Sequence, residues 1–287
     1  MGANLRAIRR KIKAVSNIWQ ITRAMQMVST SRLKKVQPRV EASREYLRRL
    51  TEITASVAGN VPADLHPYLQ QRPVLTQGLV VGAGDKGLCG SHNANLLRAA
   101  EEYIAAQTVP VKVLTVGVRA GEYAKRRGWD LIAALDTPSE TNQSRDAVAI
   151  ARAARQLFDA GEVDVLNVAY TQFLSALRRP PTISQLLPIV GEREEAVASA
   201  EYLFAPPADE LLGGLLPRNV EAQIVNMLLQ SIAAEHAARM TAMTAATDNA
   251  DELRATLTQQ HNRARQAQIT TELHEVIAGA DALAQGE

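Results

Sequence analysis

Apolar residues recur at steps of three and four over long stretches at both ends of the chain. Residues 3–37 contain neither glycine nor proline, and the first apolar positions follow the three-four-three spacing of a coiled-coil seam. Two steps of three after Val15 predict a local overwinding of that seam. Pro38 predicts a kink in a first helix over 4–58. The expected seam positions are Leu5, Ile8, Ile12, Val15, Ile18, Ile21, Met25 and Val28.

The other end carries a second long helical pattern. Between Pro217 and Gly279 lie 61 residues without glycine or proline, about 90 Å of continuous helix at roughly 1.5 Å per residue. Pro206-Pro207 and Gly213-Gly214 predict a hinge before this helix. A long helix with a narrow apolar seam needs a partner, so we expect the two ends to meet in space. Its expected seam positions are Val220, Ile224, Met227, Ser231, Ala234, Ala238, Thr241, Ala245 and, after one slip, Ala246, Ala250, Leu253 and Leu257.

The middle of the chain alternates short β-branched runs with amphipathic stretches. This alternation predicts a mostly parallel sheet with right-handed crossovers. The predicted fold class is α/β plus long helices: an antiparallel coiled coil of the N- and C-terminal helices with an inserted Rossmann-like α/β domain. The expected segments are 1–60, 61–208 and 209–287. Strands are expected at 74–81, 111–116, 130–135, 163–169 and 182–190, and helices near 93–107, 118–127 and 144–160.

Composition narrows the class of protein. Of 287 residues, 46% are hydrophobic and 22% charged, as in an ordinary soluble protein, and no run approaches the roughly 20 apolar residues of a membrane span. Cys89 is the single cysteine, which excludes an intrachain disulfide. Residues 1–50 carry 13 Lys/Arg and two Glu, a net charge of +11, and the remainder therefore carries −9. Because these charges are interleaved with apolar residues, a solvated helix face is favoured over a nucleic-acid arm.

One motif resembles a nucleotide site. The segment 82–87 matches G-x-G-x-x-G after a strand. The next helix begins only near Ser91 or Asn93, however, and no acidic residue ends the second strand to bind a ribose. A Walker pattern also fails, because Leu88 and Cys89 follow Gly87. We therefore expect a structural corner and no cofactor.

Other chemistry-bearing residues have structural interpretations. Cys89 and His92 could suggest a nucleophile and its base, but no third group is evident, so a buried thiol is expected. The histidines of the last helix are too far apart to share a metal ion and are expected on its surface. Methionines at helical spacing are expected in the core, with Met25 as an exception that is taken up below. These residues are His236, His261 and His274, and Met25, Met27, Met227, Met240 and Met243. No catalytic, cofactor-binding or metal-binding residue is predicted.

Four motifs in order resemble the gamma subunit of F-type ATP synthase, over essentially the whole chain. They are NLRAIRRKI at 4–12 with ITRAM at 21–25, GLCGSHN at 87–93, AARMTAM at 237–243 with ATDNA at 246–250, and NRARQAQIT at 262–270. The resemblance implies a central rotor whose terminal helices form an antiparallel left-handed coiled coil inside three alpha and three beta subunits. It also implies an α/β domain on the membrane c-ring, an epsilon partner, and catalysis by the beta subunits and not by this chain.

The resemblance also supplies candidate contacts with the beta subunits. Met25, Arg239, Arg265, Gln266 and Thr270 fall at positions that in the family face the catch loops and lever segments of beta. Three features depart from the family pattern: the bulky Trp19 near the shaft, the glycine-rich loop before Gly87, and His261 in place of a tyrosine. Without an evident transit peptide, the expected location is the cytoplasmic face of a bacterial membrane, as a peripheral protein.

Two other functions stay open at this point. A cofactor-binding enzyme with helical arms would explain 82–87, and titration with NAD(P) or ATP would then show stoichiometric binding. A basic coiled coil that binds nucleic acid would explain the +11 segment, and its DNA affinity would then fall steeply with salt. The rotor predicts neither result. It predicts one copy of the chain for each hexamer of alpha and beta.

Overall fold

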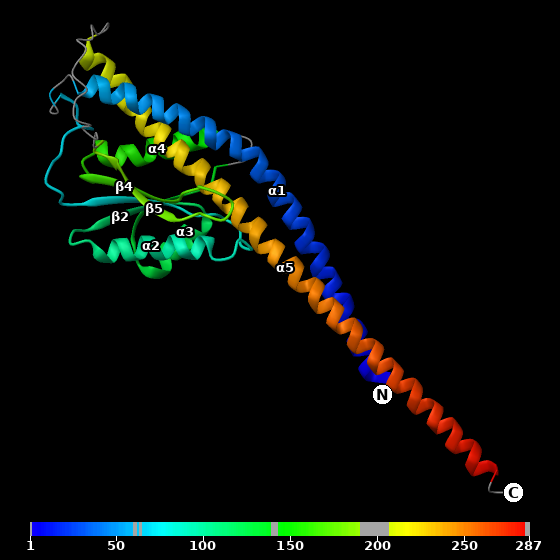
Figure 1. The fold of residues 1–287 in the computed structure, drawn as a ribbon. Coiled ribbons are helices and arrows are strands. Elements are labelled where there is room, and N and C mark those ends of the chain that lie inside the picture. Colours follow the sequence, from blue (N-terminus) through cyan, green and yellow to red (C-terminus); the bar gives the residue numbers. More distant parts are fainter. Residues whose placement is uncertain (1, 60–61, 63–64, 139–142, 190–206, 285–287) are drawn as a thin grey trace. The chain divides into compact units, whose positions relative to one another are not determined.

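The structure is a computed structural model that describes residues 2–59, 62, 65–138, 143–189 and 207–284. The chain divides into two compact units, Met1–Ser29 with Met240–Glu287, and Thr30–Arg239. We call the first the coiled-coil unit and the second the sheet unit. Helix α1 (Gly2–Ala58) and helix α5 (Ala208–Ala284) contribute to both units, and in each unit they lie side by side (Figure 1).

Helix α1 buries a continuous heptad stripe, but a different one from the stripe that the apolar pattern predicts. The buried stripe passes through Trp19 and Thr22, while Ile18 and Ile21 are exposed. The expected overwinding after Val15 is therefore wrong, because the steps of three and four alternate without interruption. Pro38 lies on the exposed face and the helix continues through it. The buried members are Val15, Thr22, Ser29, Leu33, Val36, Val40, Leu50, Thr54 and Val57.

Helix α5 begins at Ala208, next to the start of the expected segment 209–287 and before the glycines at which a hinge was expected. It runs without a break through Gly213, Gly214 and Pro217, so the expected hinge at Gly213-Gly214 is wrong; Pro206 lies outside the described residues. Leu212 and Leu216 are fully buried on either side of the glycines. Burial of two leucines stabilises by several kcal/mol, which outweighs about 1 kcal/mol of helix propensity lost at each glycine.

In the sheet unit, α5 has two buried faces. The stripe that was expected to meet α1 (Val220, Ile224, Met227) packs instead in the main core of the α/β domain. The face toward α1 carries polar residues: the Asn226 side chain donates to Ser43 Oγ at 3.3 Å, and Asn219 donates to Thr51 and Thr54. The predicted seam of α5 is therefore wrong here, because apolar periodicity indicates that a residue is buried and does not indicate which element buries it.

The α/β domain is a five-stranded sheet of order β3-β2-β1-β4-β5. β1 to β4 are parallel and β5 pairs antiparallel with β4, so the sheet is mostly parallel, as predicted. All five predicted strands and the three intervening helices are present. They are β1 (Gln77–Gly82), α2 (His92–Ala106), β2 (Val111–Val116), α3 (Val118–Arg127), β3 (Asp130–Leu135), α4 (Gln143–Asp159), β4 (Val165–Thr171) and β5 (Pro181–Leu187).

Helices cover both faces of the sheet. α2 and α3 pack on one face, where Leu79 and Val81 of β1 meet Leu96 of α2. α4 and α5 pack on the other, around Val80 (Figure 1). Burial on both faces explains why the inner strands β1, β2 and β4 are largely apolar along their length, whereas burial along the edge strand β3 alternates. The carboxyl ends of the parallel strands then meet at one edge, beside α5.

Candidate functional site

In the coiled-coil unit the two helices pair antiparallel. Val15 packs with Ala250 and Leu257, and the Thr247 hydroxyl donates to Thr22 Oγ1 at 2.9 Å. The guanidinium of Arg254 lies 5.4 Å from the centre of the Trp19 ring. Trp19, one of the departures from the family pattern, is therefore a member of the seam. Ala245 and Leu253, which were expected in the seam, are exposed.

The residues displaced from the predicted seam form a second apolar stripe on α1. Ile18, Ile21 and Val28 are 52%, 60% and 52% exposed, and Met25, half-buried, lies between them at helical spacing. Met27 is also exposed, contrary to the core position expected for it. We call Ile18, Ile21, Met25 and Val28 the outward stripe. Four large apolar side chains aligned on one helix face in water indicate a surface that a partner covers.

Three further candidates lie near the end of α5. Arg265, Gln266 and Thr270 are all exposed, and the Thr270 hydroxyl donates to the Gln266 carbonyl oxygen at 3.0 Å. Apolar side chains surround them on the exposed helix: Ile269, Leu273, Val276 and Ile277. This end of α5 thus combines donors and acceptors with uncovered apolar area, the composition of an interface.

The fifth candidate, Arg239, differs from the other four. Its residue is only 7% exposed, one guanidinium nitrogen lies 2.5 Å from Glu235 Oε1, and Nε donates to the Gly87 carbonyl oxygen at 3.3 Å. The structure therefore places Arg239 inside the sheet unit, against the glycine-rich loop. Sequence reasoning missed Glu235, although its i,i+4 spacing to Arg239 was a usable signal.

The glycine-rich loop follows β1 at the edge where a doubly wound sheet usually binds a ligand. That crevice opens where the strand order reverses, here between β1 and β4. Helix α5 fills it. Ser231 Oγ accepts from the backbone N–H of Thr171 at 3.2 Å, and the Gln230 side chain accepts from that of Phe173. A nucleotide would have to displace this helix.

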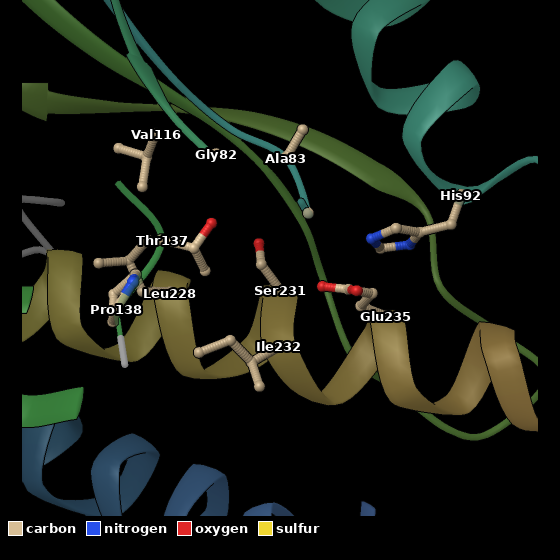
Figure 2. Close-up of a pocket in the computed structure, with 11 residues that line it drawn as sticks. Gly82, Ala83, His92, Val116, Thr137, Pro138, Leu228, Ser231, Ile232 and Glu235 are labelled. Atoms are coloured by element: carbon tan, nitrogen blue, oxygen red, sulfur yellow. The ribbon is translucent and has the colours of Figure 1, made fainter. Parts of the chain in front are cut away.

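A small cavity remains beside the loop. Its volume is about 20 Å³, enough for one water molecule and far too small for a nucleotide. Figure 2 shows His92, from the start of α2, and Glu235, from α5, pointing into the same space near Ala83. Among the described residues there is no group of three His, Cys, Asp or Glu side chains that could hold a metal ion.

The two residues that suggested nucleophilic catalysis are buried. Burial raises the pKa of the Cys89 thiol, and the nearby Glu235 carboxylate raises it further. Burial also lowers the pKa of His92 to about 4, with the charges of Arg179 and Arg239 adding to the effect. A protonated thiol is a poor nucleophile, so the geometry favours the structural interpretation of Cys89.

His92 should make folding stability depend on pH. Its pKa is lower in the folded chain than the ordinary 6.5, so neutral His92 stabilises the fold fully above pH 6.5. As the pH falls towards 4, the free energy of unfolding should decrease by up to about 3 kcal/mol. We expect His92→Gln to flatten this loss. Urea unfolding of both proteins between pH 7 and 4.5 measures it, and parallel curves would show that His92 titrates normally.

The other histidines divide between core and surface. His236 is buried on α5, contrary to the expected surface position, and His261 is half-buried. His274 is exposed, as expected. His236 follows Asn226 and Leu229 at heptad spacing on α5, and because histidine is polar, an apolar pattern does not indicate its burial.

Fold and site together define a class of protein. It is a subunit built on paired terminal helices. Its own helix α5 fills the crevice of the sheet where a ligand would bind, and the outward stripe on α1 requires a partner. Comparison with known proteins shows the family to which the chain belongs. The family described as ATP synthase matches residues 4–283.

Curated relatives match over the whole length. The chain is 42% identical over 281 residues to the ATP synthase gamma chain of Desulfitobacterium hafniense, covering 98% of this chain and 99% of that one. It is 39% identical over 288 residues to the ATP synthase gamma chain of Trichlorobacter lovleyi, at 98% and 99% coverage. A solved chain from the Euglena gracilis mitochondrial ATP synthase (OSCP, F1 and c-ring) has the same fold, with TM-score 0.75, 18% identity, and 100% and 96% coverage.

The chain therefore belongs to the ATP synthase gamma chain family. The predicted family and the predicted fold are both confirmed, and with them the role of a non-catalytic subunit in the central stalk of F1. The alternatives of a cofactor-binding enzyme and a nucleic-acid-binding coiled coil find no support. No helix in the described part of the chain has an apolar stretch long enough to cross a membrane.

Proposed function

We propose that this chain turns inside a hexamer of three alpha and three beta subunits and that its outward stripe lies against that hexamer. The observation that carries the proposal is the exposure of Ile18, Ile21 and Val28 on a helix whose other face is already buried. The exposed apolar side chains at the end of α5 support the same conclusion. A surrounding sleeve of subunits would remove both surfaces from water, which favours assembly.

One asymmetric chain within a threefold ring gives each catalytic subunit a different surface to contact. The contact energies then differ among the three beta subunits, and so do the populations of their open and closed states. Rotation of the chain exchanges these populations in turn, which couples the membrane ring to ATP synthesis or hydrolysis. The pairing of α1 with α5 resists this load through its seam.

We propose Met25, Arg265, Gln266 and Thr270 as contacts with beta. Met25 belongs to the outward stripe, and the other three are exposed on α5 among apolar neighbours. Arg239 completes the set that family resemblance gives. Because its guanidinium is buried and paired with Glu235, we propose an indirect role for it, which is developed below.

The remaining surfaces serve the other partners. We propose that 1–60 and 209–287 form the coiled coil and that 61–208 is the α/β domain that meets the epsilon subunit and the c-ring. As part of F1, the chain is peripheral to the membrane. Its relatives in Desulfitobacterium hafniense and Trichlorobacter lovleyi are bacterial proteins, which supports a location on the cytoplasmic face of a bacterial membrane.

Reconstitution tests the proposal. Alpha and beta subunits of a bacterial relative are mixed with this chain, and steady-state ATP hydrolysis is followed. We expect sustained turnover that the same subunits do not show without the chain. Equal turnover with and without the chain would contradict the proposal. Stoichiometric binding of NAD(P) or ATP to the chain alone would favour the enzyme alternative, and salt-dependent DNA binding the other.

A further inference from the structure

Helix α5 meets the glycine-rich loop through a buried ion pair. The Glu235 and Arg239 side chains are 14% and 9% exposed and lie one helical turn apart. The pair is not isolated, since Arg239 also donates to the Gly87 carbonyl oxygen. A buried pair of charges is strongly destabilised when one partner is removed, because the other is left without compensation. Such a pair therefore holds its surroundings in one arrangement.

The loop is shaped to receive this pair. A Cβ atom on Gly84 would lie 2.5 Å from Glu235 Oε2 and 2.6 Å from its Cδ, closer than carbon atoms approach. The three heavy atoms nearest to that position all belong to Glu235, and Gly84 has no positive φ that would itself require glycine. Gly84 thus provides space for a carboxylate. A glycine at this place in a Rossmann loop ordinarily lets a phosphate approach, and here an acidic side chain of the same protein takes that space.

The rest of the loop is fixed as well. The Gly84 N–H donates to Asn93 Oδ1 at 3.1 Å, and Asp85 Oδ1 accepts from the Val118 N–H and the Thr137 hydroxyl. Leu88 adopts φ +62°, a conformation that costs a non-glycine residue free energy and persists only when its surroundings impose it. The contact between Arg239 and Gly87 lies next to this residue. Contacts from α2, α3 and α5 together therefore hold loop 84–90 in a conformation that is strained at Leu88.

We propose that Glu235 and Arg239 form a latch that holds loop 84–90 on α5, and that Arg239 influences ATP turnover through this loop and not by direct contact with a surrounding subunit. Glu235 is a positioning residue that acts through Arg239, and Gly84 is its socket. The latch makes the helix and the carboxyl edge of the sheet move as one body. Its effect on turnover rests on the proposed function, whereas the latch itself does not.

The single cysteine reports on the latch in the free, full-length chain. Cys89 is buried inside the loop at 3% exposure, so a thiol reagent such as DTNB reaches it only when the loop opens. We expect Gly84→Ala to displace the Glu235 carboxylate and to speed the reaction at least about tenfold, about 1.4 kcal/mol in the opening equilibrium. Gly87→Ala is the matched control, because its added methyl meets nothing within 4 Å.

Gly84→Ala retains both charges, which separates loop opening from the direct effect of Glu235 on the Cys89 pKa. Glu235→Ala should by itself speed the reaction, and Gly84→Ala should then add nothing, because the clashing group is gone. Circular dichroism at the assay temperature verifies that each variant is folded. Equal reactivity of Gly84→Ala and Gly87→Ala would overturn the latch, as would additive effects of Gly84→Ala and Glu235→Ala.

The role in turnover needs the complex. In hexamers reconstituted with each chain, Glu235→Gln and Arg239→Gln should lower ATP hydrolysis by similar factors, and the double variant should be no slower than the slower single variant. Glu122→Gln, which removes an exposed i,i+3 pair with Arg119, is the control and should leave hydrolysis unchanged. Wild-type hydrolysis with Glu235→Gln but impaired hydrolysis with Arg239→Gln would show direct contact by Arg239 and overturn the indirect role.

Discussion

Replacing Leu253 by proline is expected to abolish most of the hydrolysis-driven rotation of the reconstituted complex. Residue 253 lies in the interior of α5, where proline removes a backbone hydrogen bond and clashes with the preceding turn at a cost of about 3 kcal/mol or more. Its neighbours Ala250 and Leu257 are buried against Val15, so a kink here separates the two helices. Rotation of a probe attached to the chain measures the loss.

Leu253→Ala is the control for this variant. The Leu253 side chain is 49% exposed and lies outside the seam, and alanine favours helix, so stability and rotation should stay near the wild-type values. Unchanged rotation by Leu253→Pro would mean that a continuous paired helix is unnecessary for torque. Loss of rotation in both variants would instead assign the effect to the side chain.

The second large effect distinguishes the seam from the outward stripe. Val15→Asp places a carboxylate in the buried contact with Ala250 and Leu257. We expect it to lower the free energy of unfolding of the coiled-coil unit by several kcal/mol. Ile18→Asp, three residues away on the exposed face, should change the stability of the free chain by at most about 0.5 kcal/mol. Urea unfolding followed by circular dichroism compares the two.

In the complex both variants should fail, for different reasons. Ile18→Asp introduces a charge into the surface that the hexamer covers, so a folded chain should bind it weakly and support little hydrolysis. Val15→Asp should fail because the helices no longer pair. If Ile18→Asp supported wild-type hydrolysis, the outward stripe would not be a contact surface.

The strands and the short helices were predictable because their signals are local. β-Branched runs such as Val111–Val116 are buried on both faces, and each predicted strand lies within a few residues of the observed one. The seam was less predictable. Both α1 and α5 carry more apolar positions than one partner covers, and periodicity cannot tell a stripe that faces a helix of the same chain from one that faces another subunit.

Polar residues inside the seam are the second reason why the predicted seam positions differ from the observed ones. Thr22, Asn219 and Asn226 are buried and hydrogen-bonded between α1 and α5, but their residue types indicated an exposed face. Polar pairs of this kind favour one register over its neighbours, because sliding by a turn would leave them unpaired. A shaft under load gains from such pairs, and their positions follow only from three-dimensional contacts.

The candidate site was predictable in part. Exposure at Arg265, Gln266 and Thr270, and the half-buried position of Met25 between exposed apolar residues, agree with a contact role, and the contacts themselves stay a prediction. The role of the glycine motif could not be predicted from the neighbouring sequence, because the carboxylate that fills the space beside Gly84 belongs to Glu235, far along the chain. The interpretation of the motif as a structural corner was based on two missing features of a nucleotide site: a helix directly after the motif and an acidic residue at the end of the second strand.

Counting the copies of this chain in the assembled complex tests the rotor most directly. Native mass spectrometry of the complex reconstituted with alpha and beta subunits gives that number. We expect one copy for three alpha and three beta subunits, since a single asymmetric shaft is what distinguishes the three catalytic sites. Three or six copies would give every beta subunit the same contacts and would contradict the rotor.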